Sequence, residues 1–195
     1  MRSFSRKLVG TLVLLGVLGS VTGAASWSAF RGESDNSGQT FSAGTVHVTD
    51  NDANAALFNL AGQKPGTVTS RCLGVTYSGS LGAEVRLFSD STIGALGPYL
   101  NLTITPGTQT GGGFGDCTGF AADSGGALFD GTLAGFRASH NAWAGGLADQ
   151  GPGGASTWTT NDTVVYRFSV SVKDDDAARN LSTGSHRFVV EAQAE

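Results

Sequence analysis

Three histidines are the first residues to test for chemistry, because they serve as metal ligands and as general bases. His47, His140 and His186 are far apart and in unrelated surroundings, and no His-Glu-x-x-His motif occurs, so the standard helical zinc-protease site is absent. The sequence also lacks a Gly-x-Ser-x-Gly motif, a phosphate-binding loop and a dinucleotide fingerprint. We therefore predict no catalytic, cofactor-binding or metal-binding residues, and a protein that is not an enzyme.

Two acidic runs are the places where calcium could bind. The first run, DNDAN, has oxygen-bearing side chains at the alternate positions Asp50, Asp52 and Asn54. Its sixth and twelfth positions are Ala55 and Ala61, where an EF-hand loop needs glycine and glutamate. The second run, residues 174–176, follows a strand-like segment. A solvated turn is the simpler interpretation of both runs, and calcium shared between loops is the alternative.

The N-terminus has the order of a secretory signal peptide. A basic region that contains Arg2, Arg6 and Lys7 precedes the apolar residues 8–21, and small residues follow. The apolar run is shorter than the ~20 residues of a spanning helix, although a count extended to Phe30 reaches that length. We predict a signal peptide over residues 1–25, with an uncleaved anchor as the alternative. Either way the domain is exported.

The cleavage position follows from the small residues at the end of the apolar run. Gly23 and Ala25 occupy the two sensitive positions for cleavage after Ala25, and Ala24 and Ala29 are the other candidates. After cleavage we expect a secreted protein, extracellular or at the cell surface, with no membrane contact.

Export changes the interpretation of the two cysteines, Cys72 and Cys117. Outside the cytoplasm an even number of cysteines favours a disulfide. Neither lies in a Cys-x-x-Cys motif or near a histidine, which argues against a metal site or a nucleophile. We predict a Cys72–Cys117 disulfide, which stabilises the fold by about 4 kcal/mol in the chain-entropy model.

The elements that would position these residues are strands. Period-two alternation is clearest in VVYRFSVSVK, residues 164–173, which puts five apolar side chains on one face and polar ones on the other. Other strand-like runs cover residues 44–50, 56–60, 67–79, 83–88, 99–105, 127–136 and 186–194. Two stretches rich in Gly, Ala and Asp, 109–126 and 139–160, are long for connections and are predicted as loops.

These runs predict an all-β domain over residues 43–195. About eight strands are the number expected for an antiparallel two-sheet, jelly-roll-like sandwich with long Gly-rich loops. Thirty glycines and only 14% charged residues also disfavour a helical protein. The net charge of −4 gives no general attraction for nucleic acid or an anionic membrane, so neither is expected as a partner.

Residues 26–42 join the signal peptide to this domain. The segment has apolar Trp27, Phe30 and Phe41 around the polar stretch RGESDNSGQT. Its polar middle is too hydrophilic to fold alone, but an extended segment of this kind can add as a strand to an open sheet edge. The simpler interpretation is that Phe41 begins the first strand of a monomer and the preceding residues form a frayed terminus.

Several short motifs in order resemble the TasA/camelysin family of exported bacterial biofilm-matrix and cell-surface proteins. The matching positions are Trp27, Ala29 and Phe30; Phe41, Gly44 and Thr45; Phe58, Asn59 and Leu60; Pro65 and Gly66; and Gly79, Ser80 and Leu81. The late run YRFSVSVKDDDAARN resembles the family's penultimate strand and acidic turn. The likeness covers about the first third of the mature chain and, weakly, its end.

The resemblance implies a jelly-roll sandwich that assembles into fibres at the cell surface or in the biofilm matrix. In such fibres the N-terminal segment of one subunit adds as a strand to the next, which would assign that role here to Trp27, Phe30 and Phe41. Self-association is therefore expected, with other matrix or cell-wall components as further partners. The alternatives are a monomeric exported binding domain and a camelysin-type metallopeptidase, although no ligand set carries over to this sequence.

Overall fold

The protein is an all-β sandwich of two antiparallel sheets, as the alternation in the sequence predicts. The computed structural model describes residues 44–149, 151–155 and 157–194. The strands in these ranges are β1 (Val48–Asp50), β2 (Thr69–Tyr77), β3 (Ala83–Phe88), β4 (Leu100–Gln109), β5 (Phe120–Ala122), β6 (Phe129–Thr132), β7 (Leu147–Asp149), β8 (Thr163–Val172) and β9 (Val189–Ala194). One α-helix, α2 (Leu133–Ser139), and four 3-10 turns, η1 (Gly97–Tyr99), η2 (Trp143–Gly145), η3 (Pro152–Gly154) and η4 (Asp176–Ala178), connect them.

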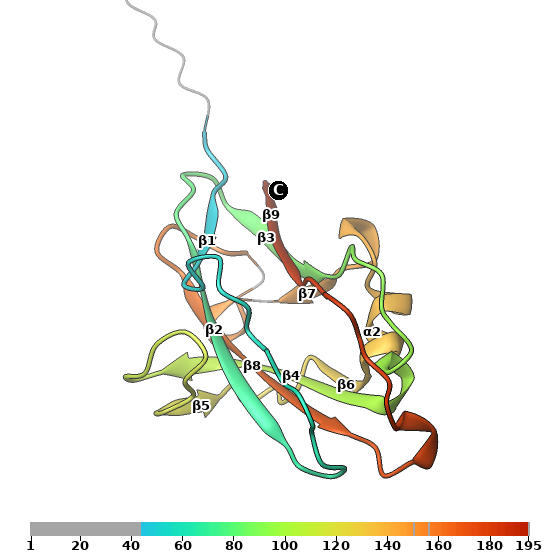
Figure 1. The fold of residues 1–195 in the computed structure, drawn as a ribbon. Coiled ribbons are helices and arrows are strands. Elements are labelled where there is room, and N and C mark those ends of the chain that lie inside the picture. Colours follow the sequence, from blue (N-terminus) through green and yellow to red (C-terminus); the bar gives the residue numbers. More distant parts are fainter. Residues whose placement is uncertain (1–43, 150, 156, 195) are drawn as a thin grey trace, which may run out of the picture. The chain divides into compact units, whose positions relative to one another are not determined.

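The two sheets differ in size. Sheet A has the order β1-β2-β8-β4-β5, and β6 also pairs with β4, whereas sheet B has the order β7-β3-β9 (Figure 1). Strand β8 lies between β2 and β4 and pairs with both along most of its length. Its five alternating apolar residues, Val164, Tyr166, Phe168, Val170 and Val172, are all buried, which confirms the predicted core face. On the opposite face, Ser169 contacts Ser70 of β2, their Oγ atoms 2.8 Å apart.

The core lies between the sheets. Tyr77 from β2, Ile104 from β4 and Leu87 from β3 are at most 1% exposed, and Phe136 of α2 is fully buried beside them. Thr132 starts α2 by accepting the Gly135 N–H at 3.0 Å. The helix packs against β4 and β6 of sheet A.

Two predicted strands are wrong. Residues 56–60 form no strand, because Leu57, Phe58 and Leu60 all pack against the core instead of alternating between core and solvent. The predicted strand 127–136 divides into β6 and the start of α2, because the Thr132 cap directs the following residues into a helix. Leu133 and Phe136, three residues apart, then share the buried helix face.

Other predictions are partly confirmed. Only Val48–Asp50 of the run 44–50 forms a strand, although Val46 and Val48 do pack against the core. The predicted loop 109–126 contains β5, and the loop 139–160 contains β7 and two 3-10 turns. The jelly-roll strand order and the domain limits stay predictions. The signal peptide, the residues at its end (Ala24, Ala25 and Ala29) and the segment 26–42 with Trp27, Phe30 and Phe41 lie outside the described residues.

Candidate functional site

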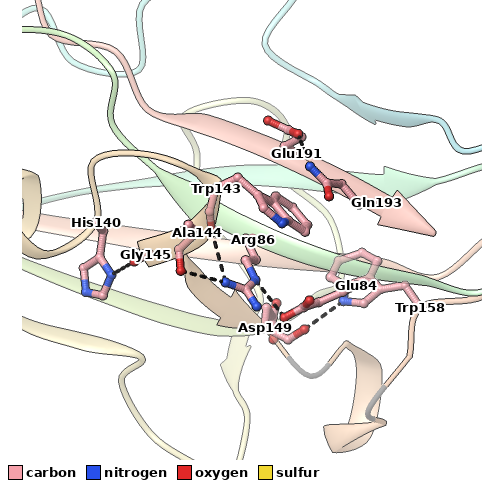
Figure 2. A network of polar contacts seen from close by, with 10 residues as sticks. All are labelled: Glu84, Arg86, His140, Trp143, Ala144, Gly145, Asp149, Trp158, Glu191 and Gln193. Carbon is pink, nitrogen blue, oxygen red and sulfur yellow. Dashed lines mark hydrogen bonds and ion pairs between the residues drawn. The ribbon is translucent and has the colours of Figure 1, made fainter. Parts of the chain in front are cut away.

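The outer face of sheet B has a network of polar side chains around Arg86 (Figure 2). Arg86 donates from Nε to Glu84 at 2.7 Å and from Nη1 to the carbonyl oxygens of Trp143 and Ala144 at 3.1 and 3.2 Å. Its guanidinium also lies 5.1 Å from the centre of the Trp143 ring, a cation–π distance. The arginine therefore holds η2 against the outer face of sheet B.

A second network joins the two sheets in the interior. The Tyr166 hydroxyl of β8 donates to Oδ2 of Asp149 at 2.5 Å, and both residues are buried. Trp158 donates from Nε1 to the Asp149 carbonyl oxygen at 3.1 Å, and its backbone bonds to that of Ala83 in both directions. Because Tyr166 belongs to sheet A and Asp149 to sheet B, this hydrogen bond ties the sheets together.

Ionisation of the Tyr166 hydroxyl should make the stability of the protein depend on pH in the alkaline range. Burial, with the negative charge of Asp149, raises the pKa of Tyr166 well above its ordinary value of 10.0. A raised pKa contributes stability that is complete below pH 10 and is lost as the pH rises further, because the unfolded tyrosine ionises first. We expect the free energy of unfolding, measured by urea titration, to fall above pH 10, and to fall less steeply in Tyr166→Phe.

The same substitution removes one hydrogen bond to a buried carboxylate, which is expected to cost about 2 kcal/mol at neutral pH. Tyr99→Phe, which changes a partly exposed tyrosine of η1, is the matched control. If the free energy of unfolding fell equally steeply above pH 10 in Tyr166→Phe and in the parent, Tyr166 would not be the cause of the fall.

Two of the three histidines, His140 and His186, flank an aromatic cluster in which Phe136 packs against Phe188. His47 is exposed before β1, and His140 ends α2, with its Nδ1 2.8 Å from the Gly145 carbonyl oxygen. His186 Nδ1 lies 3.2 Å from the Ser91 Oγ, while its buried Nε2 has no partner. Burial, followed by the positive charge of Arg137, lowers the pKa of His186. His140 and His186 thus make local structural contacts through their rings.

The acidic runs form turns. Asp50 accepts the Asp52 N–H at 3.1 Å, and Asp52 accepts the Asn54 N–H at 2.6 Å. Burial raises the pKa of Asp50 above its ordinary value. At the other run, Asp175 accepts the Ala177 N–H at the start of η4, and Asp176 pairs with Arg179 at 2.7 Å. Calcium shared between these loops remains an untested alternative to solvated turns.

Neither network forms an evident reaction centre. Across residues 44–149, 151–155 and 157–194, no three histidine, cysteine or acidic side chains lie close enough to hold a metal ion. In the same residues no helix is long and apolar enough to cross a membrane. No protein-family model matches the chain, and no curated protein has a significant sequence match to it.

The disulfide predicted between Cys72 and Cys117 is present. It links β2 to the loop between β4 and β5, which lie on the other side of β8. A hollow of about 580 Å³ adjoins it, lined by Ala56, Leu57, Asn59, Ser70, Arg71, Phe114, Gly115, Asp116 and Cys117. A smaller hollow of about 320 Å³ lies over the outer face of β1, β2 and β8.

The outer edge of β9 is the most distinctive surface feature. Within the described part of the chain, β9 pairs with β3 on one side and with no strand on the other (Figure 1). Val190 and Ala192 stand opposite Leu87 and Val85 and pack against the core, yet both are only partly buried, unlike the β3 residues. A strand edge with incompletely covered core residues can accept another strand.

Residues 56–63 also have backbone groups without backbone partners in the described ranges. Three of them, Leu57, Phe58 and Leu60, are partly buried against the core. The backbone of the segment makes no hydrogen bond to any other backbone group in the described ranges. Neither β9 nor residues 56–63 could be recognised as a site from the sequence. Their signal was the apolar composition of 56–60 and 186–194, which also fits ordinary strands.

Proposed function

We propose that this is a secreted structural protein of the cell surface or biofilm matrix, whose copies assemble into fibres by strand addition. Residues 26–42 of one copy pair with the outer edge of β9 in another copy. The observation that carries the proposal is the outer edge of β9, which pairs with no strand in the described ranges and where core-facing Val190 and Ala192 remain partly exposed.

The segment 26–42 has the properties that this edge requires. A strand added beside β9 would supply hydrogen bonds to its unpaired backbone and apolar side chains to cover the core. Trp27 and Ala29 share one face of an extended chain, Phe30 lies on the other face, and Phe41 provides a further apolar contact. The polar residues between them have no need of a core and can bridge two copies.

Self-association is tested by comparing a secreted chain that begins at Ser26 with one that begins at Ala43. We expect fibres by electron microscopy and a rising mass by light scattering only from the longer chain. The buried core residues all lie beyond residue 71, so the shorter chain is expected to keep its circular dichroism spectrum. Monomers of both chains would refute assembly and favour a monomeric binding domain.

The acceptor edge is tested by cysteine trapping. One copy carries Gln193→Cys on β9, and the other carries a cysteine at Ser28, Ser37 or Gln39 in turn. We expect a covalent dimer on a non-reducing gel for at least one of these pairs. Asp130→Cys on β6, exposed like Gln193, is the matched control and should trap no dimer. Equal trapping at both sites would argue against β9 as the acceptor.

A further inference from the structure

Different segments of the chain pair with successive parts of the outer edge of β2. β1 pairs with residues 75–77, and Asn51 then bonds to Gly74 through both its backbone and its side chain. At Cys72 the partner is the Gly115 N–H, which donates to the Cys72 carbonyl oxygen at 2.8 Å. Every second residue of an antiparallel strand presents its backbone groups to the same edge, so Ser70 is the next outward position. Apart from its register partner Ser169 in β8, no backbone group in the described ranges pairs with Ser70.

The cover at Cys72 comes from residues 110–119, which we name the guard loop. It leaves sheet A at β4, with β8 lying between β4 and β2. On its way the loop is braced by Gln109, whose Nε2 donates to the Asp116 and Thr118 carbonyl oxygens at 2.7 and 2.9 Å. Gly115 has a φ of 79°, a conformation that favours glycine, at the point where the loop meets the edge.

Three further contacts, besides the Gly115 N–H bond to Cys72, hold the far end of the guard loop. Cys117 is bonded to Cys72, with the two Cα atoms 5.2 Å apart. Phe114 packs against the core, and the Gly115 carbonyl oxygen accepts a long hydrogen bond of 3.4 Å from Arg71 Nη1. The disulfide is the one covalent contact among them. The hollow of about 580 Å³ beside Ser70 and Arg71 shows that the space along this edge is only partly filled.

The edge that the loop covers has the composition of a strand that pairs readily. Residues 67–73 read TVTSRCL, with β-branched residues, no proline and a single charge. Val68 is 63% exposed. Antiparallel pairing of two copies centred on Ser70 would place Arg71 opposite Thr69, so that no like charges face each other. Charge repulsion therefore does not oppose pairing of this edge with its own copy.

We propose that the Cys72–Cys117 disulfide keeps the guard loop over the edge of β2, and that its reduction opens this edge to pairing with the β2 edge of a second copy. A dithiol reductant supplies two electrons and two protons, breaks the S–S bond to give two thiols, and itself becomes a cyclic disulfide. This inference rests on the proposed function in one respect: β9 is taken as the edge at which copies normally assemble. The disulfide then confines strand pairing to β9.

The test uses the secreted chain with Trp27→Ser and Phe30→Ser, which remove the apolar anchors of N-terminal strand addition. In this background we expect the oxidised protein to be monomeric by light scattering. Adding Cys72→Ser and Cys117→Ser should give dimers or larger species, with at least a twofold rise in mass at the same concentration. Adding Val68→Lys should restore the monomer, because a charged residue at an exposed edge blocks pairing.

A monomeric double-serine variant would overturn the proposal, and so would association that Val68→Lys does not reverse. Should the serine variant fail to fold, the folded oxidised protein is treated with dithiothreitol instead. The Gly115 amide is then expected to exchange its hydrogen at least tenfold faster, and unchanged exchange would contradict the proposal. The chain with Trp27 and Phe30 intact tests β9 assembly separately, so failure of one proposal is distinguishable from failure of the other.

Discussion

Trp158→Ala is expected to lower the free energy of unfolding by about 3–5 kcal/mol, the range for removing a large buried aromatic side chain. Trp158 heads the group of largest fully buried side chains and is 0% exposed. Its substitution would leave a cavity between the sheets and remove the Nε1 hydrogen bond to Asp149. The backbone bonds between Trp158 and Ala83 do not depend on the side chain, so the strand register should persist.

The measurement is urea unfolding followed by circular dichroism, with Trp143→Ala as the matched control. Trp143 lies in the same predicted loop, but it is only half-buried and its ring mainly contacts Arg86. A cation–π contact at an exposed site contributes about 0.5–1 kcal/mol, so the control should lose about 1 kcal/mol. Equal losses for the two variants would contradict the position of Trp158 in the core.

Replacing both Cys72 and Cys117 with serine is expected to lower the free energy of unfolding by about 4 kcal/mol. The bridge joins residues 45 apart, and the chain-entropy model assigns about this value to a loop of that length. For a domain of about 150 residues, this corresponds to a drop in Tm of roughly 8–16 °C. Cys72 is 1% exposed, so serine also leaves a buried hydroxyl in its place.

Calorimetry and urea unfolding of the oxidised, reduced and double-serine proteins measure this effect. The reduced protein separates loss of the bridge from the serine substitutions, because its thiols keep the original side chains. Both proteins should lose several kcal/mol. A reduced protein as stable as the oxidised one would show that the bridge does not restrict the unfolded chain in the way the entropy model requires.

The sequence predicts the sandwich because its central strands bury one face only. In β8 apolar and polar residues alternate from Tyr166 to Val172 and burial follows that alternation, whereas Val165 is apolar and buried on the other face. The pattern fails at 56–60, where consecutive apolar residues all contact the core without joining a sheet. It also fails at Thr132, because a single cap decides whether the next residues form helix or strand.

The interior network was less accessible to prediction. Asp149 and Trp158 lie in a stretch whose Gly, Ala and Asp residues are typical of loops, and their partner Tyr166 resembles any core residue of β8. Their contact depends on how the two sheets face each other, which local patterns do not encode. The cysteine pair, by contrast, follows from the cysteine count and the predicted export, and the structure contains the predicted disulfide.

The unequal size of the sheets has a consequence for cooperativity. Sheet A contains three strands bonded on both sides, β2, β8 and β4, whereas in the described part of sheet B only β3 is bonded on both sides. Opening free energies in a native protein follow this kind of local support. We therefore expect sheet B to open locally at a lower free energy than sheet A. Sheet B contains β9, the proposed acceptor strand. Binding of a second copy at β9 would therefore stabilise the sheet that opens more easily.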